Sequence, residues 1–156
     1  MRKGLFAFAA AFALPFVSSA SAQAPAHVDL DSVKPIGGSW TYRAITGGSD
    51  ATFVDVAGAK RLVLRCNRTA RTVSIVRSEA PAAAATLSIW TSFIARSVPS
   101  RFVASRELVA DLMATDALLD AIAFSRGRVA TAAAGAPMVA VRAGPEATRV
   151  IEDCRG

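Results

Sequence analysis

The sequence has very little of the chemistry that most enzyme sites need. It contains one histidine, His27, and two cysteines, Cys66 and Cys154, among 156 residues. A metal site with several histidines is therefore excluded by count, and the cysteines do not form a Cys-x-x-Cys motif. The sequence also lacks a glycine-rich phosphate loop and a Gly-x-Ser-x-Gly turn. We therefore expect no catalytic residues, no cofactor and no metal site.

A long apolar run is also missing. The apolar stretch Leu5–Val17 has 13 residues, whereas a membrane-spanning helix needs about 20. The stretch follows a short basic start and precedes an Ala-x-Ala site formed by Ala20 and Ala22. This layout is typical of a secretory signal peptide. We expect cleavage after Ala22, a periplasmic or secreted chain that begins at Gln23, and no transmembrane span once the signal peptide is removed.

Lysine is scarce, and arginine supplies most of the positive charge. The sequence carries 18 basic and 12 acidic residues, for a net charge of +6. Loss of residues 1–22 would leave 16 basic residues and a net charge of +4, with Lys34 and Lys60 as the remaining lysines. Guanidinium groups suit the recognition of an anionic ligand, although an alanine- and arginine-rich composition explains the bias without one. No dense basic block is present, so we expect no nucleic-acid partner.

The two cysteines predict one disulfide bond. An even cysteine count in an exported chain favours pairing, and Cys66 has only Cys154 as a partner within the chain. Leu62, Leu64 and Cys66 alternate on one face of a predicted strand, while Cys154 ends an apolar helical stripe that begins at Ala147. If both faces turn to one core, the bond attaches the C-terminal helix to the strand.

The apolar patterns predict one domain of the α+β class. After the signal peptide at 1–22 and a flexible lead-in at 23–38, residues 39–156 form a single globular domain. We expect a mainly antiparallel sheet or sandwich of seven to eight short strands with two late helices, and an all-β sandwich is the alternative. The stretch 96–113 fits a strand or a helix, and we favour a strand near 106–113. The other expected strands are 39–44, 51–56, 61–66, 72–77, 86–94, 128–133 and 138–142.

Capping residues mark the two helices. Thr115 or Asp116 is suited to cap a helix through Ala123, and Gly127 lies where such a helix ends. Pro145 and Glu146 open the second helix, with proline at the first position and an acid in the first turn.

The segment Ser125–Arg128 is the most specific local feature. Arg126 and Arg128 flank Gly127 at a junction between helix and strand, where they form a possible contact with a partner or an anion. The alternative is that both arginines pair with nearby acids, namely Asp116, Asp120, Glu152 or Asp153.

Three motifs carry a family resemblance. Leu62–Cys66 reads Leu-x-Leu-Arg-Cys, Asp116–Arg128 reads DALLDAIAFSRGR, and Glu152–Arg155 reads EDCR. Together they resemble a family of small, uncharacterised exported bacterial proteins. The order of motifs is also distantly similar to periplasmic proteins associated with type VI secretion. Neither resemblance implies a functional residue.

These observations favour binding over catalysis. We expect a non-enzymatic envelope protein that binds another envelope protein or an anionic ligand, as an inhibitor or an assembly accessory. The alternative is a small hydrolase that uses two carboxylates, which would lie within about 5–10 Å of each other in one concave pocket.

Overall fold

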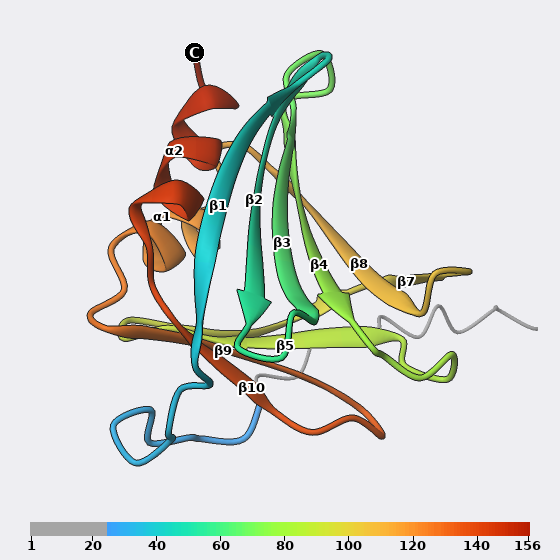
Figure 1. Cartoon of the computed structure of the whole chain (residues 1–156), viewed down its shortest axis with the longest axis vertical. Coiled ribbons are helices and arrows are strands. Elements are labelled where there is room, and N and C mark those ends of the chain that lie inside the picture. The colour runs from blue at the N-terminus through green and yellow to red at the C-terminus, as the bar shows by residue number, and fades with distance from the viewer. Residues whose placement is uncertain (1–24) are drawn as a thin grey trace, which may run out of the picture.

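Figure 1 shows the computed structural model, which describes residues 25–156. The predicted signal peptide, its cleavage site and the start of the lead-in lie outside the described residues. In this part of the chain no helix is long and apolar enough to cross a membrane. The elements are β1 (Gly38–Ile45), β2 (Gly48–Asp55), β3 (Lys60–Asn67), β4 (Thr72–Ser78), β5 (Thr86–Trp90), β6 (Ala95–Pro99), β7 (Arg101–Val103), β8 (Glu107–Met113), α1 (Ala117–Ala123), β9 (Arg128–Ala133), β10 (Val139–Arg142) and α2 (Pro145–Asp153).

The strands form two antiparallel sheets, which confirms the predicted α+β sandwich. The first sheet has six strands in the order β1-β2-β3-β4-β8-β7, and the second has four in the order β10-β9-β5-β6. In Figure 1 the strands of the second sheet cross beneath those of the first, and both helices lie at the side of β1. The two inner faces enclose the main core, as in a sandwich of crossed sheets.

The core face of the first sheet follows the predicted alternation. Leu62, Leu64 and Cys66 of β3 are all buried, and Leu64 pairs with Ala51 on one side and Ile75 on the other. In the stretch 96–113, where strand and helix both fitted, the strand favoured near 106–113 is confirmed as β8, which pairs with β4. The period of two in side-chain direction therefore places one continuous apolar surface toward a core that the first sheet shares with the helices and the second sheet.

Both helices begin where their capping residues predict. The Asp116 carboxylate accepts a hydrogen bond from the backbone N–H of Leu118 at 2.8 Å, which caps α1. Pro145 is the first residue of α2. The buried side of α2 packs on β1, β2 and β3 and against α1.

The disulfide joins Cys66 to Cys154 with a Cα–Cα distance of 5.4 Å, as the shared apolar faces predict. Two arginines of the β3–β4 hairpin support the same attachment. Arg68 donates to the carbonyl oxygen of Asp153 at 3.3 Å, and Arg71 donates to that of Arg155 at 3.0 Å. These bonds occupy carbonyl groups that lie at and beyond the C-terminal end of α2, where helices leave carbonyls unpaired.

The structure has ten strands, more than the seven to eight expected. The predicted strand 86–94 ends at Trp90, and β6 and β7 follow. The cause is Thr91, whose hydroxyl accepts hydrogen bonds from the N–H groups of Phe93 and Ile94 and donates to the Ile94 carbonyl. Threonine bonds of this kind compete with strand pairing and favour a turn. Phe93 and Ile94 therefore lie in an exposed turn and not in a strand.

The lead-in lies against the second sheet. Its interpretation as a loose segment did not predict the contacts that it makes there. Val28, Leu30 and Val33 pack against a small cluster that contains Trp90 on the outer face of that sheet. The Trp90 indole N–H donates to the carbonyl of Ala26 at 3.0 Å. The second sheet is therefore covered on both faces.

Candidate functional site

Exposed large apolar side chains gather at one place on the described surface. Five such side chains are exposed within residues 25–156, and three of them adjoin each other: Phe93, Ile94 and Phe124, exposed by 54%, 39% and 69%. We call these three residues the apolar patch. The other two, Val56 and Met113, lie in the β2–β3 turn and at the end of β8. The clustering distinguishes the patch from the scattered apolar groups of an ordinary surface.

The patch borders a hollow of about 390 Å³. Phe93 and Ile94 line it from the β5–β6 turn, and Phe124 lines it from the end of α1. Its other lining residues are Ala117, Asp120 and Ala121 of α1. We call this space the apolar hollow.

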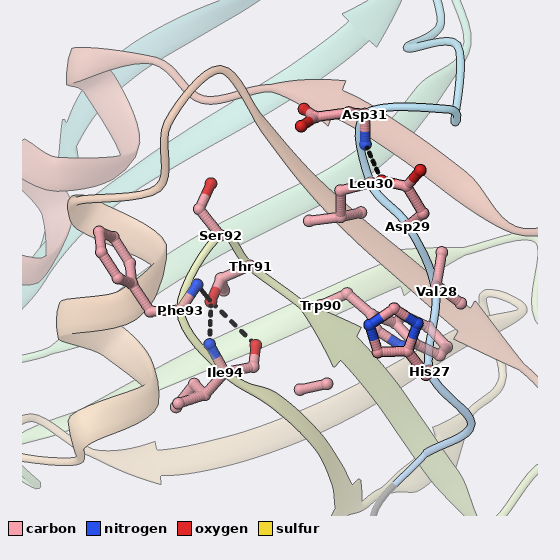
Figure 2. Close-up of a pocket in the computed structure, with 11 residues that line it drawn as sticks. His27, Val28, Asp29, Leu30, Asp31, Trp90, Thr91, Ser92, Phe93 and Ile94 are labelled. Atoms are coloured by element: carbon pink, nitrogen blue, oxygen red, sulfur yellow. Dashed lines mark hydrogen bonds between the residues drawn. The ribbon is translucent and has the colours of Figure 1, made fainter.

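A second hollow, of about 350 Å³, lies on the other side of the β5–β6 turn. Figure 2 shows it: Phe93 extends away from His27 and Trp90, which lie on the lead-in side of the turn. His27 is thus brought back onto the domain, in a space also lined by Ser92 and two aspartates of the lead-in. The turn therefore separates a polar hollow from the apolar one.

Ser92 and Ser125 fix the two segments that carry the patch. The backbone N–H of Ser92 donates to the Ser125 hydroxyl at 3.1 Å, and that hydroxyl donates to the Arg128 carbonyl at 2.6 Å. The backbone N–H of Arg126 in turn donates to the Ser92 hydroxyl at 2.8 Å. The Ser92 hydroxyl itself donates to the Arg126 carbonyl at 3.2 Å, so its hydrogen is not directed to a base such as His27, as activation of a nucleophile requires.

The two candidate contact arginines have different roles. Arg128 donates through Nη1 to the carbonyl oxygens of Leu30, Asp31 and Val33 at 2.6, 2.9 and 2.8 Å, so its side chain holds the lead-in. Arg126 is exposed, and its guanidinium carbon lies 5.9 Å from the centre of the Phe93 ring. Gly127 between them has a φ of 86°, a left-handed conformation that favours glycine. Of the two, only Arg126 adjoins the patch.

The acids proposed as partners of these arginines pair elsewhere. Asp116 binds Arg96 at 2.8 Å, and Asp120 binds Arg155 at 2.7 Å. Burial opposes ionisation of Asp116, but hydrogen bonds from Arg96 and the backbone of Leu118 outweigh it, so its pKa lies below the usual value. Both acids, the N-cap Asp116 and Asp120 of α1, therefore already have an arginine partner within this chain.

The C-terminal acids are also engaged. Asp153 accepts a hydrogen bond from the Tyr42 hydroxyl at 2.7 Å, and Glu152 lies 3.5 Å from Arg155. Burial tends to raise the pKa of Asp153, yet the hydrogen bond from Tyr42 and other favourable interactions leave it below the usual value. The alternative in which Arg126 and Arg128 pair with Asp116, Asp120, Glu152 or Asp153 is wrong.

A concave surface with two carboxylates lies on the outer face of the first sheet. This hollow of about 490 Å³ is lined by Glu107 and Asp111, among others. They are four residues apart on β8, which separates their Cα atoms by about 13 Å. Hydrogen bonding to Lys60 lowers the pKa of Glu107, whereas a general acid needs a raised pKa. Asp111 pairs with Arg101 at 3.2 Å. This geometry gives little support to the hydrolase alternative.

The sequence pattern does not identify the patch residues as a group. The pattern of α1 contained a usable indication, because Leu118, Leu119 and Ile122 share its buried side and Phe124 falls on the opposite side. Phe93 and Ile94 gave no such indication, since both suit a buried strand. In the described part of the chain no three His, Cys, Asp or Glu side chains are grouped to hold a metal ion.

Together the fold and the site define a disulfide-linked α+β sandwich with one clustered apolar surface. No protein family, curated protein or solved structure was found to match this chain.

Proposed function

We propose that this chain is a non-enzymatic exported envelope protein that binds a partner protein through the apolar patch, as an inhibitor or an assembly accessory. The disulfide supports an oxidising compartment such as the periplasm or the exterior. The signal-peptide pattern of residues 1–22 supports the same location.

The clustering of Phe93, Ile94 and Phe124 is the observation that carries the proposal. Exposed aromatic side chains gain free energy when a partner removes them from water, and such groups dominate protein interfaces. The serine bonds that fix both segments add to this, because a preorganised surface loses less conformational entropy on binding.

A capture experiment tests the proposal. The bait is the tagged protein recovered after export, whose N-terminus should begin at Gln23. It is incubated with an envelope extract, and the captured proteins are quantified by mass spectrometry. We expect a reproducible partner that the Phe93→Ser, Phe124→Ser double variant no longer captures.

The matched control is the Val56→Ser, Met113→Ser variant, which removes two exposed apolar side chains outside the patch. It should capture the same partner as the unaltered protein. Equal capture by the patch variant and the control variant would contradict the proposal.

A further inference from the structure

The charged side chains around the apolar hollow differ in whether they have an ion-pair partner within this chain. Asp120 lines the hollow, and Asp116 precedes α1, whose residues form one wall. Each of these acids already binds an arginine of this chain, at 2.7 and 2.8 Å respectively. Neither carboxylate therefore needs a cation from a partner.

Arg126 is different. Among residues 25–156, no carboxylate lies within ion-pair distance of its guanidinium. Its backbone N–H is bonded to the Ser92 hydroxyl, and its guanidinium lies over the Phe93 ring. The edge of the apolar patch therefore carries the positive charge of Arg126, which is held in place and has no carboxylate partner among residues 25–156.

From this charge arrangement we infer the chemistry of the partner, on the basis of the proposed function. The partner presents a bulky apolar side chain that enters the apolar hollow, and beside it an aspartate or glutamate that pairs with Arg126. A guanidinium binds a carboxylate through paired hydrogen bonds, and burial of the neighbouring apolar groups strengthens that pair. Arg126 is then the residue that selects an acidic over a basic partner segment.

A protein segment fits this surface better than an anionic lipid surface. Arg126 supplies a single uncompensated charge beside the patch, whereas attachment to an anionic lipid surface uses a cluster of basic residues. One peptide carboxylate is enough to pair with Arg126.

The test is a selection of random twelve-residue peptides displayed on phage, with the purified full-length exported protein as the target. The unaltered protein should enrich peptides with a large apolar residue next to Asp or Glu. The Arg126→Glu variant should enrich Lys or Arg at that position, and the Arg106→Glu variant, altered in the exposed β7–β8 turn, should keep the acidic preference. A synthetic peptide of the enriched sequence should lose at least about tenfold in affinity on Arg126→Glu.

The outcomes separate the two proposals. Suppose the enriched peptides require Phe93 and Phe124 but show the same charge preference with the unaltered protein, the Arg126→Glu variant and the Arg106→Glu variant. This result would overturn the present inference and leave the proposed function standing. A selection in which no enriched peptide depends on Phe93 and Phe124 would overturn both. Vesicles of phosphatidylglycerol that bind the protein, and fail to bind the Phe93→Ser, Phe124→Ser variant, would replace the protein partner with a lipid surface.

Discussion

The hydroxyl groups of Ser92 and Ser125 lie 3.2 Å apart and connect the β5–β6 turn to the segment after α1. Ser125 is buried, and its hydroxyl also donates to the Arg128 carbonyl. Phe93 and Phe124, which follow Ser92 and precede Ser125 in the chain, line the same hollow. The hydrogen-bonded serine pair therefore fixes the two segments that carry the apolar patch relative to each other.

Ser125→Ala should lower the free energy of unfolding by about 1–3 kcal/mol, because buried hydrogen-bond partners lose their bonds. It should also weaken partner capture, since the two patch segments are no longer tied. Ser32→Ala, at an exposed hydroxyl of the lead-in, should change stability by less than about 0.5 kcal/mol. Urea unfolding followed by tryptophan fluorescence measures both variants, and equal midpoints would refute a structural role for Ser125.

Arg128→Ala should detach the lead-in. Its guanidinium bonds three carbonyl groups, so removal should cost about 1.5–3 kcal/mol and speed amide exchange around Val28–Val33. Arg126→Ala is the matched control and should change stability by no more than about 0.5 kcal/mol, because the side chain is exposed. The same loss in both variants would show that Arg128 does not hold the lead-in.

Replacement of both cysteines by alanine should lower stability by about 2–5 kcal/mol, since the bond closes a long loop. Hydrogen exchange should show α2 losing protection first, while the β1–β2 hairpin keeps more of its own. Peptide mapping of the unreduced protein should give one linked pair that contains Cys66 and Cys154. Two free thiols in protein taken from its own compartment would contradict the assignment.

Acid should destabilise the protein below about pH 4. Hydrogen bonds from the Ala59 backbone and from Arg61 hold the pKa of Asp55 below its usual value, and the pKa values of Glu107, Asp116 and Asp153 are also lowered. A carboxylate with a depressed folded pKa stabilises the fold above its unfolded pKa, about 4, and this contribution is lost as pH falls through the folded pKa.

The expected urea midpoint therefore falls as the pH decreases below about 4, where these carboxylates take up protons in the unfolded chain before they do so in the folded protein. Urea midpoints measured from pH 5 downwards test this pH dependence. The Asp116→Asn variant lacks one of these carboxylates, so its midpoint should fall less steeply as the pH decreases. A midpoint that rises as pH decreases from 5 would contradict the assignment of these carboxylates.

Local chemistry made much of the fold predictable. The strand face of Leu62, Leu64 and Cys66, the cap at Asp116 and the start of α2 at Pro145 each depend on neighbours in sequence. The disulfide could be predicted because two apolar faces and an even cysteine count agree.

Other features depend on contacts that no local pattern encodes. Arg77 is buried at a core position of β4 and donates to the Pro137 carbonyl at 3.3 Å, a partner 60 residues away. Burial lowers its pKa. The apolar patch was missed for a similar reason, because Phe93 and Ile94 suit a strand until the Thr91 side chain turns the chain.

Photo-crosslinking in cells that export the chain tests the binding role of the apolar patch most directly. Benzoylphenylalanine is placed at Phe124, and in separate variants at Val56 and Met113, which are exposed outside the patch. We predict one discrete crosslinked protein from position 124, lost when Phe93→Ser is added, and no such product from positions 56 and 113. The same product from all three positions, or none from position 124, would contradict a partner-binding role for the patch.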